Sequence, residues 1–126
     1  MRYKILLLIA AITAGAASCY RDVISPGVNP NGPPQDISFS GDLVPLFQQS
    51  CAGTGCHDAV PSHAPSLVAD KAYNALTTQG FINMAVPEKS IIYVDVSNGS
   101  MPPTGGLSAA ESKKILDWIR NGAPNN

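Results

Sequence analysis

Two cysteines and a histidine lie within seven residues, in the segment Cys51-Ala-Gly-Thr-Gly-Cys56-His57. Two thiols on one short turn can bond the two vinyl groups of a haem, and an imidazole directly after the second thiol can reach the iron. The usual spacing for this attachment is Cys-x-x-Cys-His, so the loop here is two residues longer. Gly53 and Gly55 would let the longer loop fold tightly. The motif therefore favours a covalently attached haem.

Two other interpretations of these residues stay open at this point. Cys51 and Cys56 could form a disulfide in an oxidising compartment. They could also join His57 and His63 in a zinc site of two thiolates and two imidazoles, although the adjacent Cys56 and His57 would then both have to face one metal. His63 lies in a proline-flanked segment, which predicts an exposed loop position.

A methionine much further along the chain, Met101, is followed directly by two prolines. A thioether is a soft, neutral iron ligand that stabilises ferrous haem and raises its reduction potential. Pro102 and Pro103 would stiffen the loop that presents it. Methionines more often pack in cores, and that is the role we expect for Met84. A core role suits Met101 poorly, because turn-forming residues follow it.

The chain has 126 residues, of which 44% are apolar and only 13% are charged, against a usual charged share of about 25%. This length predicts one domain. Basic and acidic residues nearly balance, with a net charge of −1, so no broad basic surface is expected for nucleic acid. A domain this small often needs a disulfide, a metal or a cofactor to complete its core.

Residues 1–18 have the pattern of a secretion signal. Arg2 and Lys4 form a short positive end, and the uncharged apolar segment after them is too short to span a bilayer comfortably. Small residues then lead to Cys19, as in bacterial lipoprotein signals, which predicts that Cys19 is lipidated and becomes the first mature residue. Ordinary cleavage nearby, with Cys19 as a stray thiol, is the alternative. Without this leader the chain carries six basic and nine acidic residues, a net charge of −3.

Residues 19–35 are rich in proline and glycine and show no hydrophobic periodicity, so we expect a flexible tether there. The folded domain then spans residues 36–126. Its first predicted helix begins at Ser40 as N-cap, and a second is expected from Asp70 to about Gln79.

The segment Ile91–Val96 is ambiguous. Its β-branched residues favour a strand, whereas Pro87 and Glu88 before it suit the first turn of a helix. The last helix is predicted more clearly, because Ser108 and Glu111 have the spacing of a capping box. One apolar face follows on that helix, formed by Ile115, Leu116, Trp118 and Ile119.

Together these segments resemble the mono-haem c-type cytochromes of bacteria. The opening pattern FS-x-D-[IL]-x-P-[IL]-F of that family is matched from Phe39 to Phe47, shortly before the first cysteine. The closing patterns MPP-x-G, LS-x-x-E and I-x-x-WI-x-x-GA are matched at Met101–Gly105, Leu107–Glu111 and Ile115–Ala123. The matches extend across essentially the whole predicted domain.

The resemblance implies an all-α, cytochrome c-like domain wrapped around one covalently attached haem c. By similarity, Cys51 and Cys56 bind the haem vinyl groups, His57 is the proximal iron ligand and Met101 is the distal one. The family also suggests a helix in the ambiguous segment. Phe47 and Trp118 would meet where the first and last helices cross, and both would pack in the haem pocket. The residues expected to pack there are Phe47, Trp118 and Pro102.

A protein of this kind is a one-electron carrier and not an enzyme, because both axial positions of the iron are filled. We therefore expect redox proteins as partners, no nucleic acid, and membrane attachment through the lipid on Cys19, on the periplasmic or cell-surface side. Two other functions stay open. One is a haem sensor or oxidoreductase subunit in which Met101 dissociates, and the other is a non-haem binding lipoprotein with a Cys51–Cys56 disulfide.

Overall fold

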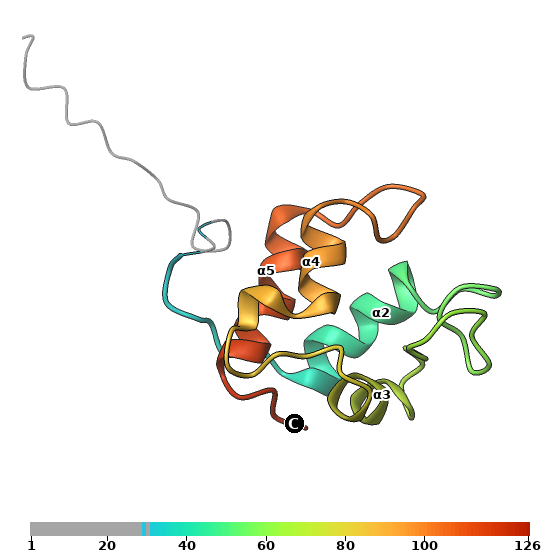
Figure 1. The fold of residues 1–126 in the computed structure, drawn as a ribbon, viewed down its shortest axis with the longest axis horizontal. Coiled ribbons are helices and arrows are strands. Elements are labelled where there is room, and N and C mark those ends of the chain that lie inside the picture. The colour runs from blue at the N-terminus through green and yellow to red at the C-terminus, as the bar shows by residue number, and fades with distance from the viewer. Residues whose placement is uncertain (1–28, 30) are drawn as a thin grey trace, which may run out of the picture.

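The computed structural model describes residue 29 and residues 31–126. The predicted signal at residues 1–18, the lipidation of Cys19 and most of the tether lie outside the described residues. The described part consists of helices and loops without a strand (Figure 1), which confirms the all-α fold class. No helix in this part is long and apolar enough to cross a membrane. The elements in chain order are η1 (Phe39–Leu43), α2 (Val44–Ser50), α3 (Ala72–Thr78), η2 (Pro87–Lys89), α4 (Ile91–Ser97) and α5 (Ala109–Arg120).

The first helix begins earlier than predicted, and its cap is Ser38 instead of Ser40. The Ser38 hydroxyl accepts a hydrogen bond from the Gly41 amide at 3.0 Å, and the Ser38 amide donates to Asp42 Oδ2 at 3.0 Å. Ser40 lies inside the π-helical turn η1, where its amide donates to the Asn126 carbonyl at 2.8 Å. This long-range contact with the C-terminus could not be anticipated from local spacing.

The ambiguous segment is a helix, α4, as the family resemblance suggested. Pro87 and Glu88 form the short 3-10 turn η2, and Ser90 follows in an extended conformation as the N-cap of α4. Ile92 and Val96 are buried, a spacing of four residues that places both on one helical face. Packing of that face therefore overrides the β propensity of the segment.

The last helix forms as predicted. Ser108 caps α5 and exchanges hydrogen bonds with Glu111 in a capping box. The four residues of its predicted apolar face are all buried. In contrast, α3 is shorter than predicted by two residues at its start and one at its end.

The core is centred on the Phe39 ring, between the first and last helices. Its centroid lies 5.1 Å from that of Trp118 and 6.3 Å from that of Phe47. Tyr73 also packs edge-on against Phe39, at 5.2 Å. Phe47 and Trp118 were expected to meet where the first and last helices cross. In the structure, Phe39 packs against both rings and joins them.

Met84, which we expected in the core, is 56% exposed. It lies in the turn that the Asn83 side chain holds by accepting hydrogen bonds from the Ala85 and Val86 amides. This polar turn directs the chain along the surface, so the prediction for Met84 was wrong.

The end of the predicted tether is bonded to α5. The Gln35 amide donates to Asp117 Oδ2 at 3.1 Å, and Asn121 Nδ2 donates to the Gln35 carbonyl at 2.7 Å. Asp117 is buried and also pairs with Lys113, one turn earlier on the same helix. Gln35 therefore joins the N-terminal segment to the domain at α5.

Candidate functional site

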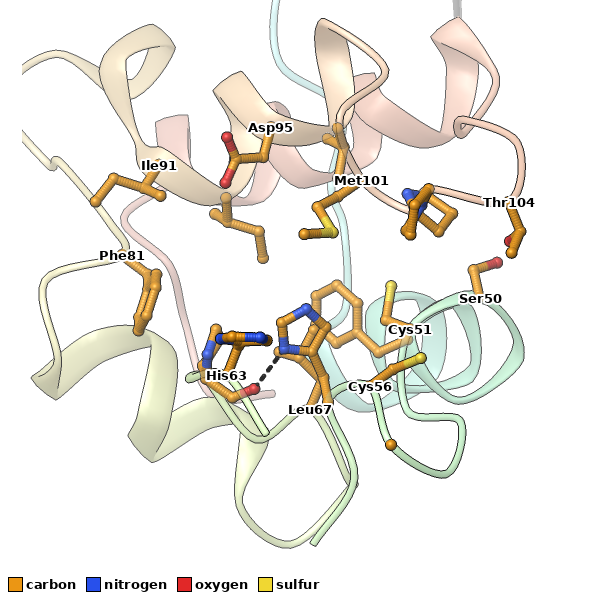
Figure 2. A pocket seen from close by; sticks show the side chains of 18 residues that line it. Ser50, Cys51, Cys56, His63, Leu67, Phe81, Ile91, Asp95, Met101 and Thr104 are labelled. Carbon is orange, nitrogen blue, oxygen red and sulfur yellow. Dashed lines mark hydrogen bonds between the residues drawn. The ribbon is translucent and has the colours of Figure 1, made fainter. Parts of the chain in front are cut away.

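A cavity between the two halves of the domain brings together the four residues that the sequence singled out. Its lining includes Cys51, Cys56 and His57, which follow α2, and Met101, which follows α4. In Figure 2, Met101 reaches into the cavity from the side of α4, while Cys51 and Cys56 lie across the cavity from it. The remaining wall is mainly apolar and includes Phe47, Leu67, Phe81, Ile91, Ile92 and Val96.

The His57 imidazole is held by a hydrogen bond to the protein backbone. Its Nδ1 lies 2.8 Å from the Pro65 carbonyl oxygen, the contact drawn as a dashed line in Figure 2. A carbonyl only accepts, so Nδ1 carries the proton and donates it, which leaves the lone pair on Nε2. The His57 carbonyl also accepts a hydrogen bond from the Leu67 amide at 2.8 Å. This arrangement orients an imidazole for metal binding, as the outer hydrogen bonds of histidine ligands do.

The loop between the two cysteines is folded back on itself. The His57 amide donates to the Cys51 carbonyl at 3.1 Å, and the Cys56 amide donates to the Gly53 carbonyl at 2.9 Å. Gly55 adopts a positive φ of 80°, which favours glycine. The two additional residues are therefore accommodated in a small closed loop that keeps Cys51 next to His57.

Asp58 fastens this loop, and sequence reasoning missed it. Its Oδ2 accepts a hydrogen bond from the Gly55 amide and its Oδ1 accepts one from the Val60 amide, each at 3.0 Å. The Asp58 carbonyl also accepts a hydrogen bond from the Ser66 hydroxyl at 2.7 Å. An aspartate directly after the histidine was the available signal, because Asp side chains often cap turns in this way.

Both cysteines in the described part of the chain are free thiols, Cys51 half-buried and Cys56 exposed. Burial, with a smaller effect from the neighbouring Cys56, raises the pKa of the Cys51 thiol to about 11. Cys51 is therefore protonated at neutral pH. The two thiols are not joined in a disulfide in this structure.

The zinc alternative finds no support in residues 31–126, where no three His, Cys, Asp or Glu side chains are grouped to hold a metal ion. His63 is exposed, as expected for its loop, yet it also lines the cavity. Asp95 on α4 is a further lining residue, and sequence reasoning did not identify it.

The three expected packing residues separate into two groups. Phe47 and Pro102 line the cavity. Trp118 does not, because it is completely buried in the core, where it contacts Phe39 and Tyr73. The Trp118 indole also donates to the Pro124 carbonyl at 2.9 Å, which ties the Trp118 ring to the segment after α5. Trp118 contacts Phe39, which in turn packs against Phe47 in the cavity wall.

Comparison with protein-family models, with curated proteins and with solved structures found no match to this chain.

Proposed function

We propose that this protein is an exported one-electron carrier that holds one covalently attached haem c in the cavity described above. The observation that carries the proposal is the convergence of two free thiols, an oriented imidazole and a thioether on one mainly apolar cavity. Each of these groups has a known role toward haem. Their residues come from two segments far apart in the sequence, which local spacing alone would not bring together.

Cys51 and Cys56 would attach the haem. Each thiol would add across one vinyl double bond, its sulfur bonding to one carbon and its hydrogen passing to the other, so no oxidant would be required. The hydrogen bond from the His57 amide to the Cys51 carbonyl holds the backbones of the two residues together. The longer cysteine spacing is compatible with attachment because the additional residues fold into a side loop.

His57 and Met101 would fill the two remaining coordination positions of the haem iron. A haem bound here supplies one-electron exchange between its ferric and ferrous states. The Met101 thioether favours the ferrous state and raises the reduction potential. With both positions filled by side chains, no site is left for a substrate, so the protein would pass one electron from a donor to an acceptor without acting as an enzyme.

The partners are proposed to be redox proteins that carry basic docking surfaces. Outside residues 1–18 the chain has three more acidic than basic residues, and complementary charge speeds and orients protein encounters. A lipid on Cys19 would hold the protein on the periplasmic or cell-surface side of a bacterial membrane. The segment before the domain would let it move between fixed partners.

Expression in a host with haem c maturation machinery tests the proposal. We expect a red protein that keeps its haem through denaturing electrophoresis, and a colourless product would refute covalent haem binding. His57→Ala should abolish iron ligation and stable maturation.

Carbon monoxide distinguishes the electron carrier from the haem sensor with a displaceable Met101. When the gas is added to the reduced protein at neutral pH, the carrier should show no rapid spectral change. A rapid change would favour the sensor.

A further inference from the structure

A group of hydrogen bonds joins the Met101 loop to the end of α4. The Ser100 amide and hydroxyl lie 2.8 and 2.7 Å from Asn98 Oδ1, and the hydroxyl also lies 3.0 Å from the Asp95 carbonyl. The Met101 amide donates to that same Asp95 carbonyl at 2.9 Å. We call Asp95, Asn98 and Ser100, with these bonds, the Ser100 clamp.

The clamp uses a carbonyl that the helix itself leaves free. Carbonyl groups in the last turn of a helix have no partner within the helix, and Asp95 lies two residues before the end of α4. Gly99, with a positive φ of 79°, lets the chain turn back so that Ser100 and Met101 reach this carbonyl. Asn98 holds the turn, because its side-chain oxygen accepts from the Ser100 amide.

The two prolines after Met101 cannot replace these contacts. Pro102 and Pro103 restrict the loop, but a proline has no amide hydrogen to donate. The hydrogen bond from the Gly105 amide to the Pro102 carbonyl, at 3.3 Å, closes the loop on itself and does not reach α4. Stiffness therefore comes from the prolines, while attachment of the loop to α4 comes from Ser100 and Met101.

We propose that Ser100 and Asn98 are positioning residues that hold the Met101 thioether in the cavity and limit its displacement from iron. This inference rests on the proposed function. Ser100 does not line the cavity, so it acts through the backbone of Met101. Loss of its hydroxyl frees the backbone next to Met101 and raises the fraction of molecules in which the thioether has left the iron.

Imidazole added to the haem-loaded, oxidised protein measures that fraction, because it binds only when Met101 is displaced. A neutral hydrogen bond contributes a net free energy that corresponds to a factor of about five in an equilibrium constant. We expect Ser100→Ala to bind imidazole about fivefold more tightly and to lose the sulfur-to-iron charge-transfer band at correspondingly lower imidazole concentration. Ser100→Thr keeps the hydroxyl and should restore the wild-type values.

Ser97→Ala is the matched control. The Ser97 hydroxyl also donates to a carbonyl of α4, that of Val94 at 3.1 Å, but it makes no hydrogen bond to the Met101 loop. Its imidazole affinity should equal that of the wild type. Equal affinities for Ser100→Ala and Ser97→Ala in a haem-loaded protein would overturn the inference and leave the proposed function intact. A protein without covalent haem would refute both.

Discussion

The buried ion pair on α5 gives the prediction with the clearest magnitude. The side chains of Lys113 and Asp117 are only 4% and 1% exposed, and Lys113 Nζ lies 2.5 Å from Asp117 Oδ2. That oxygen also accepts from the Gln35 amide, while Asp117 Oδ1 is buried without a partner. Lys113→Met keeps an unbranched side chain of similar length and removes the positive charge. The Asp117 carboxylate then stays buried with the Gln35 amide as its hydrogen-bond donor.

Removal of one partner of a buried pair costs about 3–5 kcal/mol. Domains of this kind have a total free energy of unfolding of about 5–15 kcal/mol, so a large part of the stability would be lost. With a shift of about 4 °C or more for each kcal/mol, Tm should fall by at least about 12 °C. The double variant Lys113→Met/Asp117→Leu removes both charges and should recover most of that loss.

Urea unfolding of the same preparation measures the effect, with the m-value as the check that the denatured state is unchanged. Lys114→Met is the matched control, because Lys114 is the next residue on α5, its side chain is 43% exposed, and its Asp42 partner lies 3.7 Å away. An exposed pair of this kind contributes about 0–1 kcal/mol. If Lys113→Met costs no more than Lys114→Met, the reasoning from burial is refuted.

Three further predictions concern the site and the last helix. Met101→Ala should leave the haem attached, lower the reduction potential and remove the sulfur-to-iron band; an unchanged potential and spectrum would assign the sixth ligand to another residue. Asp58→Ala, which loses the hydrogen bond to the Gly55 amide, should raise the fraction of protein with a single thioether by about fivefold, as measured by mass spectrometry, with the exposed Asp70→Ala as control. Hydrogen bonds from Ser108 lower the pKa of Glu111 below its usual 4.5, so the stability that Glu111 contributes is present above pH 4.5 and is lost as the pH falls through the lowered value. The difference in urea midpoint between wild type and Glu111→Gln should therefore be present at pH 7 and shrink below pH 4.5, and a difference that persists unchanged at low pH would contradict the role of the capping box.

Local signals were sufficient where one element determines its own structure. The Ser108 and Glu111 capping box and the apolar face after it predicted α5, because the cap and the face are both encoded within that helix. The spacing of Cys51, Cys56 and His57 likewise identified one side of the cavity. Met101 was connected to it by the ligand chemistry of its thioether, by the two prolines after it and by the family resemblance, and the structure places it across the cavity from the cysteines.

Long-range contacts determined what the sequence did not predict. Ser38 caps the first helix in place of Ser40, and the C-terminal residue Asn126 accepts hydrogen bonds from the Ser38 hydroxyl and the Ser40 amide. Trp118 contacts Phe39 and not the cavity, since several helices together determine which face of α5 meets which neighbour. Asp58 and the Ser100 clamp also escaped prediction, because a short polar side chain near a turn shows its hydrogen-bond partner only when the backbone is known.

The hydrogen bonds of Gln35 to Asp117 and Asn121 determine where the N-terminal segment meets the domain. No residue of α5 lines the cavity, and Figure 1 shows the chain from residue 31 approaching the domain beside α5, away from the loop that follows α2. A lipid anchor upstream would therefore pull on the domain at a point remote from the cavity. The domain could pivot about Gln35 and change its tilt relative to a membrane, while the route by which a partner approaches the cavity stayed clear.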